Sequence, residues 1–306
     1  MKTILITGAT GYIGRALTQR LIDDGFRVIA LSRSPENART ILPASVKCLP
    51  WDGSTVGEWG SAIEESDGVV NLAGENIGNR LWSESFKRKI LESRLNAGKA
   101  IAEAIQKASP KPGFLFQASA IGYYGSRGDE ILGEDASKGS GFMADVVDQW
   151  EASVAPVTES GVRVVYLRTG VVLGKGSGLI SRMQLPFKLF IGGPPGSGRQ
   201  WFSWIHLADE VGSIRYLMEM EAAGGIYNLV APNPLLMREF CRLFGQALHR
   251  PSWLPVPAPI LKQIFRDFAE EAILSSQRVI PQRLLKAGYQ FRFPHLPEAL
   301  QEIFSS

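Results

Sequence analysis

Several features that often reveal a protein's class are scarce or missing in this chain of 306 residues. It has two cysteines, Cys48 and Cys241, far apart and without a ligand motif, so neither a disulfide framework nor a zinc site is indicated. No apolar run reaches the roughly 18 residues of a membrane span. The net charge of +3 is too small to indicate a nucleic acid or an anionic membrane. We therefore expect no metal, no nucleic acid and no membrane as partners.

The overall composition is that of an ordinary globular protein, with 45% hydrophobic and 21% charged residues. Its length allows one large domain with a smaller lobe, or two domains. The N-terminal residues are typical of a strand rather than of a signal peptide, so a cytoplasmic location is the default expectation. Nothing in the composition fixes the oligomeric state, and both a monomer and a homodimer stay open.

The most informative stretch is the opening, MKTILITGATGYIG. Residues 3–7 are typical of a buried strand, and residues 12–22 have apolar positions at helical spacing. A second strand is predicted over 27–31. A glycine-rich turn between a strand and a helix, followed by another strand, is the context of a dinucleotide-binding site.

The physical reason is that free amides and the positive end of the helix dipole point at whatever lies over the turn, which suits a pyrophosphate. Gly8 would permit the tight turn, Gly11 the approach of the ligand, and Gly14 the packing of helix on strand. A purely structural turn is the alternative. The predicted contacts here are Gly8, Thr10, Gly11, Tyr12, Ile13 and Gly14.

Strands and helices continue to alternate along the chain, which predicts a parallel sheet covered on both faces. We expect a Rossmann-type, doubly wound α/β domain over 1–173, with its sheet completed by parts of 202–230. Residues 174–306 are expected to form substrate-side loops and a smaller, mainly helical C-terminal lobe. Further strands are predicted at 46–49, 68–72, 113–117 and 162–167, and helices at 83–108, 142–159, 237–248 and 260–273.

The end of the second strand bears on which dinucleotide binds. It ends in Ser32 and Arg33, with no acid to hold a free ribose. A guanidinium can instead pair with a ribose 2′-phosphate, which favours NADP(H) over NAD(H). Arg33 could also be a solvated residue before a helix that begins at Pro35. Trp51 and Asp52, after the third strand, would flank the adenine, although Trp51 suits a core position equally well.

Small residues follow the fourth strand and would let a cofactor lie across the strand ends. They are Leu72, Ala73 and Gly74, and Glu75 after them would be a polar contact or a helix cap. The chain also contains, in this order, AGENI, WEA, RTGVVLG, LPFKL, GGPPGSG, WIHLAD, NLVAPNP and VIPQRLLKAGYQF. Together with TGATGYIG, these strings resemble the extended short-chain dehydrogenase/reductase superfamily. More narrowly, they resemble its NAD(P)-dependent epimerase-like subfamily, whose members are often labelled cell-division inhibitors.

The resemblance implies a Rossmann-type domain that binds NADP(H). It places cofactor contacts on the glycine turn, Ser32, Arg33, Leu72, Ala73, Arg94 and Val172. Arg94 is of particular interest, because the helical pattern places it near an apolar stripe, where a charge needs a partner. A cofactor group would serve, and an ion pair with Glu75 or another acid is the alternative.

The resemblance fails at the proton relay. The superfamily uses a tyrosine, a lysine four residues later and a serine. Ser119 follows the fifth strand as expected, but the tyrosine and lysine positions fall on about Met143 and Val147, which cannot move a proton.

Substitutes for the missing pair are Tyr123 or Tyr124, which would need a cation such as Lys89 or Arg94 nearby. His206 titrates near neutrality and is a candidate acid or base, or else a helix cap. The candidate catalytic residues are thus Ser119, Tyr123 and His206.

We expect an NADP(H)-dependent oxidoreductase or epimerase-like enzyme that acts on a small carbonyl or hydroxyl compound through a non-standard proton relay. A non-catalytic NADP(H) sensor or interaction protein is the alternative, and an ordinary nucleotide-sugar epimerase is a third possibility. The fold cannot decide among them, because function depends on the site.

Overall fold

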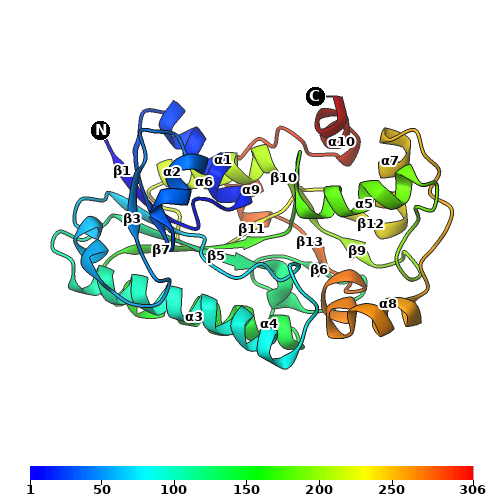
Figure 1. The fold of residues 1–306 in the computed structure, drawn as a ribbon, viewed down its shortest axis with the longest axis horizontal. Coiled ribbons are helices and arrows are strands. Elements are labelled where there is room, and N and C mark those ends of the chain that lie inside the picture. The colour runs from blue at the N-terminus through cyan, green and yellow to red at the C-terminus, as the bar shows by residue number, and fades with distance from the viewer. Residues whose placement is uncertain (306) are drawn as a thin grey trace.

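A seven-stranded parallel sheet forms the centre of the computed structural model, which describes residues 1–305 (Figure 1). Its strand order is β3-β2-β1-β4-β5-β7-β11, so the direction of winding reverses between β1 and β4. The predicted doubly wound Rossmann-type fold is therefore confirmed. The strands are β1 Thr3–Thr7, β2 Arg27–Ser32, β3 Lys47–Pro50, β4 Gly68–Asn71, β5 Phe114–Ala120, β7 Arg163–Thr169 and β11 Gly225–Leu229.

Helices cover both faces of this sheet, as the near-continuous apolar strands require. One face packs against α1 (Tyr12–Asp23), α2 (Pro35–Ile41), α6 (Leu207–Glu219) and α9 (Gln282–Lys286). The other packs against α3 (Glu84–Lys107) and the 3-10 helices η1 (Glu58–Ile63) and η3 (Ala155–Ser160). Figure 1 shows the two groups above and below the sheet.

Two predicted helices are shorter in the structure. The helix expected over 142–159 ends as α4 at Phe142–Ala152, because Pro156 has no N–H to continue the ladder, and η3 follows. The helix expected over 260–273 is α8 at Ala258–Phe265, followed by the π-helical turn η4 at Ala269–Ile273. The sequence analysis assigned no helix to the apolar segment after residue 174, which contains α5 (Gly178–Lys188).

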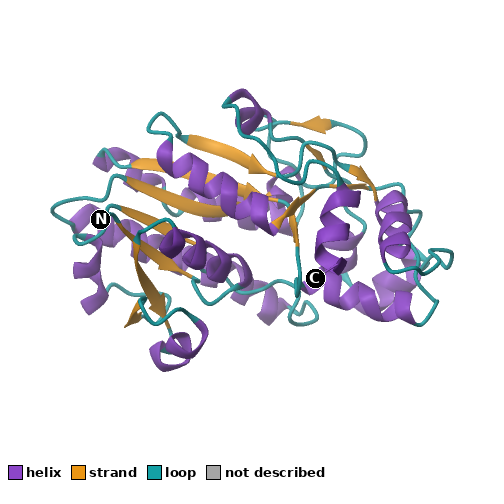
Figure 2. Ribbon diagram, turned by 90° about the horizontal axis from the view of Figure 1, so that it is seen from above, coloured by secondary structure: helices purple, strands orange, loops and turns teal. Residues whose placement is uncertain are grey.

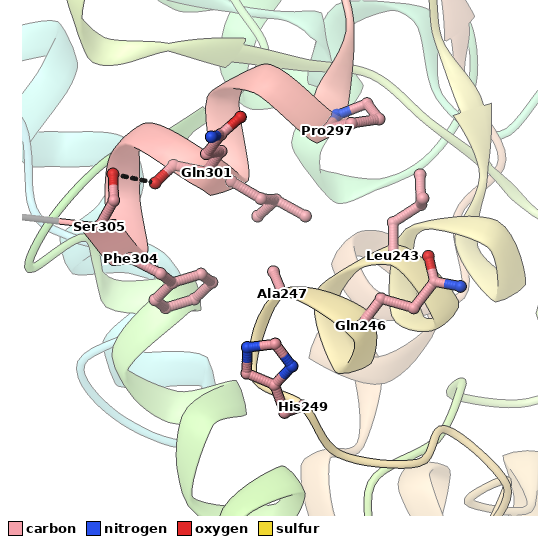
Figure 3. A pocket seen from close by; sticks show the side chains of 9 residues that line it. Leu243, Gln246, Ala247, His249, Pro297, Gln301, Phe304 and Ser305 are labelled. Carbon is pink, nitrogen blue, oxygen red and sulfur yellow. Dashed lines mark hydrogen bonds between the residues drawn. The ribbon is translucent and has the colours of Figure 1, made fainter.

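The C-terminal part is a helical lobe with several short strands, at the end of the molecule opposite the N-terminus (Figures 1 and 2). Its core lies among α5, α7 (Met237–Ala247) and α10 (Leu296–Ser305). A cavity of about 520 Å³ lies between α7 and α10 (Figure 3). The short strands of residues 174–305 are β9 Trp201–Phe202, β10 Trp204–His206, β12 Leu235–Leu236 and β13 Arg278–Val279, of which β10 pairs with β8 (Val171–Leu173) and β13 with β6 (Ile131–Leu132).

None of the helices in residues 1–305 has the length and apolar character needed to cross a bilayer. Within the same residues, His, Cys, Asp and Glu side chains form no group of three or more that could hold a metal ion.

Candidate cofactor and active site

The glycine turn between β1 and α1 is as tight as its sequence suggests. Gly8 has φ +68°, and a Cβ there would lie 2.7 Å from the carbonyl oxygen of Leu72. A Cβ on Gly14 would lie 2.2 Å from the carbonyl oxygen of Gly8, so this glycine packs against the turn itself rather than against the strand. Both positions exclude any side chain. The turn therefore holds the start of α1 close to the ends of β1 and β4.

The start of α1 is suited to an anion. Gly11 is the N-cap residue and is exposed, with no side chain capping the helix. The first turn of α1 contains no acidic residue. The amides of this turn and the helix dipole are thus available to a phosphate group. Thr10, Tyr12 and Ile13, the other predicted contacts in this stretch, are partly buried beside it.

A buried chain of hydrogen bonds ties together the carboxyl ends of β1, β4 and β5. The hydroxyl of Thr7 donates to Asn71 Oδ1 at 2.5 Å and accepts from the amides of Leu72 and Ala73, both at 3.1 Å. Asn71 Nδ2 donates to Gln117 Oε1 at 2.8 Å. This network, which no local sequence pattern indicates, fixes the edge where ligands bind in doubly wound sheets.

Arg94 from α3 lies beside this edge and is 9% exposed. Its Nη1 donates to the backbone carbonyls of Ile90 and Glu75 at 2.9 and 3.0 Å, and its guanidinium lies over the Trp150 ring. The Glu75 side chain pairs with Lys89 instead, at 3.0 Å, so the ion pair considered for Arg94 is not formed.

Within residues 1–305, Arg94 Nε has no hydrogen-bond partner. Burial lowers the pKa of the guanidinium to about 10, so the side chain is still charged at neutral pH. A buried cation with a free donor fits a group supplied from outside the chain.

The residues expected around the adenosine part of the cofactor differ in their contacts. Ser32 is partly buried and its hydroxyl bonds to the backbone of Ser34, while Arg33 is exposed beside it. Trp51 is buried against Trp59 with ring centroids 5.5 Å apart, which favours the core alternative. The carboxylate of Asp52 accepts from the Thr55 hydroxyl at 2.6 Å and from the amides of Thr55 and Ser54, and these bonds lower its pKa to about 2. The Asp52 carboxylate therefore stabilises its own turn.

At the end of β5, Ser119 is part of a buried polar network that the sequence analysis missed. Its hydroxyl donates to Glu151 Oε1 at 2.5 Å. Arg168 holds the same carboxylate through Nε and Nη2, each at 2.8 Å. Arg168 is 1% exposed, and its Nη1 donates to Tyr124 OH at 3.1 Å. A serine hydroxyl is thus hydrogen-bonded to a carboxylate fixed by a bidentate arginine.

The two tyrosines of η2 (Ile121–Tyr124) have different environments. Tyr124 is buried, donates to Asn228 Oδ1 at 2.7 Å, and has its pKa raised by burial. Tyr123 is partly buried, and the Arg168 guanidinium stacks on its ring at 3.4 Å from the centroid. The cation near both tyrosines is therefore Arg168, and not Lys89 or Arg94 as the sequence suggested.

Met143 and Val147 of α4 face the 3-10 helix η2. A Cβ on Gly122 in η2 would lie 3.4 Å from Met143 Cβ and 3.8 Å from a methyl group of Val147. Both side chains are buried in an apolar cluster. The positions at which the superfamily has tyrosine and lysine thus lie beside the end of β5, the strand that contains Ser119. In this chain their side chains cannot carry a proton.

His206 is the N-cap residue of α6, the alternative considered for it. Its Nδ1 accepts from the amide of Ala208 at 3.2 Å, and its Nε2 lies 3.1 Å from a carboxylate oxygen of Glu302 on α10. The side chain is buried, which lowers its pKa. Because both ring nitrogens are engaged, we assign His206 a structural role.

Glu210, in the first turn of α6, is fully buried beside the end of β7. It accepts from Thr169 Oγ1 at 2.9 Å, and its Oε2 has no partner within residues 1–305. Burial raises the pKa of the carboxyl to about 8. The unfolded value is about 4.3, so stability is full below that pH and is lost as the pH rises to about 8.

We expect the free energy of unfolding to fall with pH in this window by about 1.4 kcal/mol per unit for this one proton. Glu210→Gln, which cannot ionise, should remove that slope in urea unfolding measured from pH 5 to pH 9. Glu159→Gln, at an exposed carboxylate, is the control and should keep it. Equal slopes in wild type and Glu210→Gln would contradict the assignment.

The sheet, the uncapped helix start and the free donor of Arg94 together define a dinucleotide-binding protein of the Rossmann type. Comparison with known proteins agrees. Residues 4–229 match the model of the NAD dependent epimerase/dehydratase family, and residues 256–303 match a domain of unknown function, DUF1731. The chain belongs to the NAD dependent epimerase/dehydratase family and is an NAD(P)-binding protein.

Similar proteins cover nearly the whole chain. The epimerase family protein YfhF of Bacillus subtilis is 36% identical over 99% of this chain and 98% of its own. The crystal structure of human epimerase family protein SDR39U1 with NADPH is 38% identical, covers 99% of both chains and has a TM-score of 0.88. A nucleoside-diphosphate sugar epimerase from Corynebacterium glutamicum is 33% identical over 99% of this chain and 58% of its own, with a TM-score of 0.78.

Proposed function

We propose that the protein is an NADP(H)-dependent oxidoreductase that interconverts a small carbonyl compound and its alcohol. The observation that carries the proposal is the 2.5 Å contact between Ser119 Oγ and Glu151 Oε1 at the end of β5. Any buried hydroxyl needs a hydrogen-bond partner, and the partner of Ser119 is a carboxylate, which can also take up a proton. The carboxylate can therefore supply the base that Met143 and Val147 cannot.

The roles follow from the hydrogen bonds. In the direction of oxidation, the substrate hydroxyl gives its proton to Ser119 Oγ while the serine proton passes to Glu151 Oε1. NADP⁺ supplies the hydride acceptor, so the C–H electron pair leaves with the hydride and a carbonyl forms. Reduction is the reverse. Arg168 orients the carboxylate, and Tyr123, stacked on Arg168, lies beside this network.

The preference for NADP(H) over NAD(H) is part of the proposal. Arg33 is exposed directly after Ser32, the last residue of β2. It is therefore available to a ribose 2′-phosphate. The crystal structure of the human relative contains NADPH, which supports the same assignment.

We expect Arg33→Ala to weaken NADPH binding about 10- to 100-fold, since a charge-assisted hydrogen bond is worth about 1.5–3 kcal/mol. NADH binding should change less than about threefold, since NADH lacks the phosphate. Isothermal titration calorimetry with both nucleotides measures the two effects. Arg39→Ala, at an exposed arginine of the following helix α2, is the matched control. Equal losses for NADPH and NADH would remove the assignment.

The catalytic proposal is tested by following nicotinamide absorbance with NADPH and a panel of aldehydes, ketones and nucleotide sugars. With a compound that is turned over, Ser119→Ala and Glu151→Gln should each lower kcat about 10²-fold or more. NADPH affinity should be unchanged in both. Ser61→Ala, at an exposed serine of η1, is the control. Full activity in either site variant would exclude the relay.

A non-catalytic NADP(H) sensor or interaction protein is the second candidate. The burial of Met143 and Val147 at the usual positions of the proton relay favours it. Tight NADPH binding with no turnover of any compound in the panel would replace the oxidoreductase by this candidate. An ordinary nucleotide-sugar epimerase ranks third, because the usual tyrosine and lysine are missing from α4.

A further inference from the structure

Exposed apolar side chains gather on the C-terminal lobe. Of the fourteen large apolar residues that are exposed in residues 1–305, nine lie in two segments, 185–191 and 253–264. The most exposed are Trp253 at 64% and Leu185 at 63%. Contiguous exposure of this kind is unusual in soluble monomers and marks an interaction surface. The nine residues, here called the apolar face, are Leu185, Leu189, Phe190, Ile191, Trp253, Leu254, Val256, Ile260 and Ile264.

Hydrogen bonds join the end of the first segment to the start of the second. Trp253 Nε1 donates to the carbonyl oxygen of Phe190 at 2.9 Å, and the amide of Leu254 donates to Gly192 at 3.2 Å. The amide of Val256 donates to Pro194 at 3.0 Å. The end of α5 and the chain leading into α8 are therefore adjacent, at the end of the molecule far from the N-terminus (Figure 1).

Both segments of the apolar face lie in stretches of the sequence that contain no acidic residue. Residues 160–208 and 240–266, which include both segments, contain no Asp or Glu. The Arg250 guanidinium lies 4.7 Å from the centroid of the Phe190 ring, and Lys188 precedes Leu189 and is exposed. The basic residues in or directly beside the two segments are Lys188, Arg250 and Lys262.

The first carboxylates after the second segment are already paired. Asp267 binds Lys87 of α3, and Glu270 lies 2.6 Å from Lys262. Glu271 accepts from the amides of Phe142 and Met143 at the start of α4. None of these three offsets the positive charge of Lys188 or Arg250.

We propose that the apolar face docks the protein on the surface of an anionic phospholipid bilayer. Aromatic and aliphatic side chains flanked by Lys and Arg are the composition that binds at such a surface. Tryptophan prefers the level of the headgroups. Each basic residue near an anionic leaflet adds to the electrostatic attraction.

Other occupants suit this surface less well. A second copy docked through the same face would bring two sets of positive charges together, because a two-fold interface pairs identical patches. A partner helix needs a groove, whereas Trp253 and Leu185 project with more than half of their surface exposed. The small net charge of the whole chain, +3, gave no sign of a membrane partner, because acidic residues elsewhere balance these two segments.

The test is co-sedimentation of the full chain with sucrose-loaded vesicles of phosphatidylcholine alone or with 30% phosphatidylglycerol. We expect binding to the anionic vesicles, weakened by high salt, and little binding to the neutral ones. Trp253→Ser should lower the partition coefficient at least tenfold, while Leu285→Ser, at an exposed leucine of α9, should not. Lys188→Glu should lower it about tenfold, and Lys99→Glu on α3 should not.

Absence of binding to anionic vesicles at millimolar lipid would overturn the proposal. So would binding that all four variants retain, because another surface would then be responsible. A concentration-dependent dimer in light scattering that Trp253→Ser disrupts, without vesicle binding, would assign the face to a second copy instead. Glu151→Gln should bind vesicles like the wild type, so this result is independent of the proposed reaction.

Discussion

Replacing Gly14 with alanine is expected to abolish NADPH binding in the range accessible to calorimetry, which means a loss of at least 100-fold in affinity. The added Cβ would lie 2.2 Å from the carbonyl oxygen of Gly8 and 2.8 Å from Ala9 Cα. Both are backbone atoms, so the whole turn or the start of α1 must move. The amides that would hold the pyrophosphate move with it. Overpacking of this kind also costs about 1–3 kcal/mol of stability.

Gly178→Ala is the matched control, because a Cβ at this glycine of α5 would have no atom within 4 Å. Its NADPH affinity and melting temperature should equal those of the wild type. Circular dichroism shows whether Gly14→Ala is folded at the titration temperature. Folded Gly14→Ala with wild-type affinity for NADPH would show that the dinucleotide is held elsewhere.

Arg168→Met is expected to lower the free energy of unfolding by about 3–5 kcal/mol, the usual cost of removing one partner from a buried ion pair. The Glu151 carboxylate, whose side chain is only 12% exposed, would lose both hydrogen bonds from the guanidinium. Tyr124 would lose a donor as well. Equilibrium unfolding in urea measures the change.

Two further variants separate the buried charge from simple loss of packing. In Arg168→Met with Glu151→Leu, no carboxylate stays unpaired, so much of the stability should return. Lys107→Met breaks the Lys107–Glu103 pair of α3, whose side chains are 70% and 53% exposed, and should cost less than about 1 kcal/mol. Equal losses in Arg168→Met and Lys107→Met would show that the network around Glu151 is not stabilising.

The central fold and the glycine turn could be predicted from the sequence because their signals are local. The first strand, the glycine turn and the first helix lie within 25 residues. At Gly8, Gly11 and Gly14 a Cβ would come too close to backbone atoms of the turn or its neighbours. Apolar runs and helical spacing likewise report which segments pack on the sheet.

The network at Ser119 could not be predicted in the same way. Glu151 and Arg168 lie on α4 and β7, 17 residues apart, and meet Ser119 only because α4 packs near the end of β5. The sequence did contain one signal, because the charged Arg168 directly follows the apolar run 164–167, and a charge beside a buried strand needs a partner. For His206 the sequence allowed two roles, an acid–base group or a helix cap. Its contacts with Ala208 and Glu302 show that it is the cap.

The sequence by itself determined the alternation of strands and helices in the N-terminal half, the turn that can hold a dinucleotide, and the absence of tyrosine and lysine from α4. These follow from backbone sterics and hydrophobic periodicity, which act over a few residues. Only the tertiary structure decided which carboxylate meets Ser119, which guanidinium is left with a free donor, and where exposed apolar groups collect. Those contacts join residues tens of positions apart, and their energies depend on burial, which no local pattern specifies.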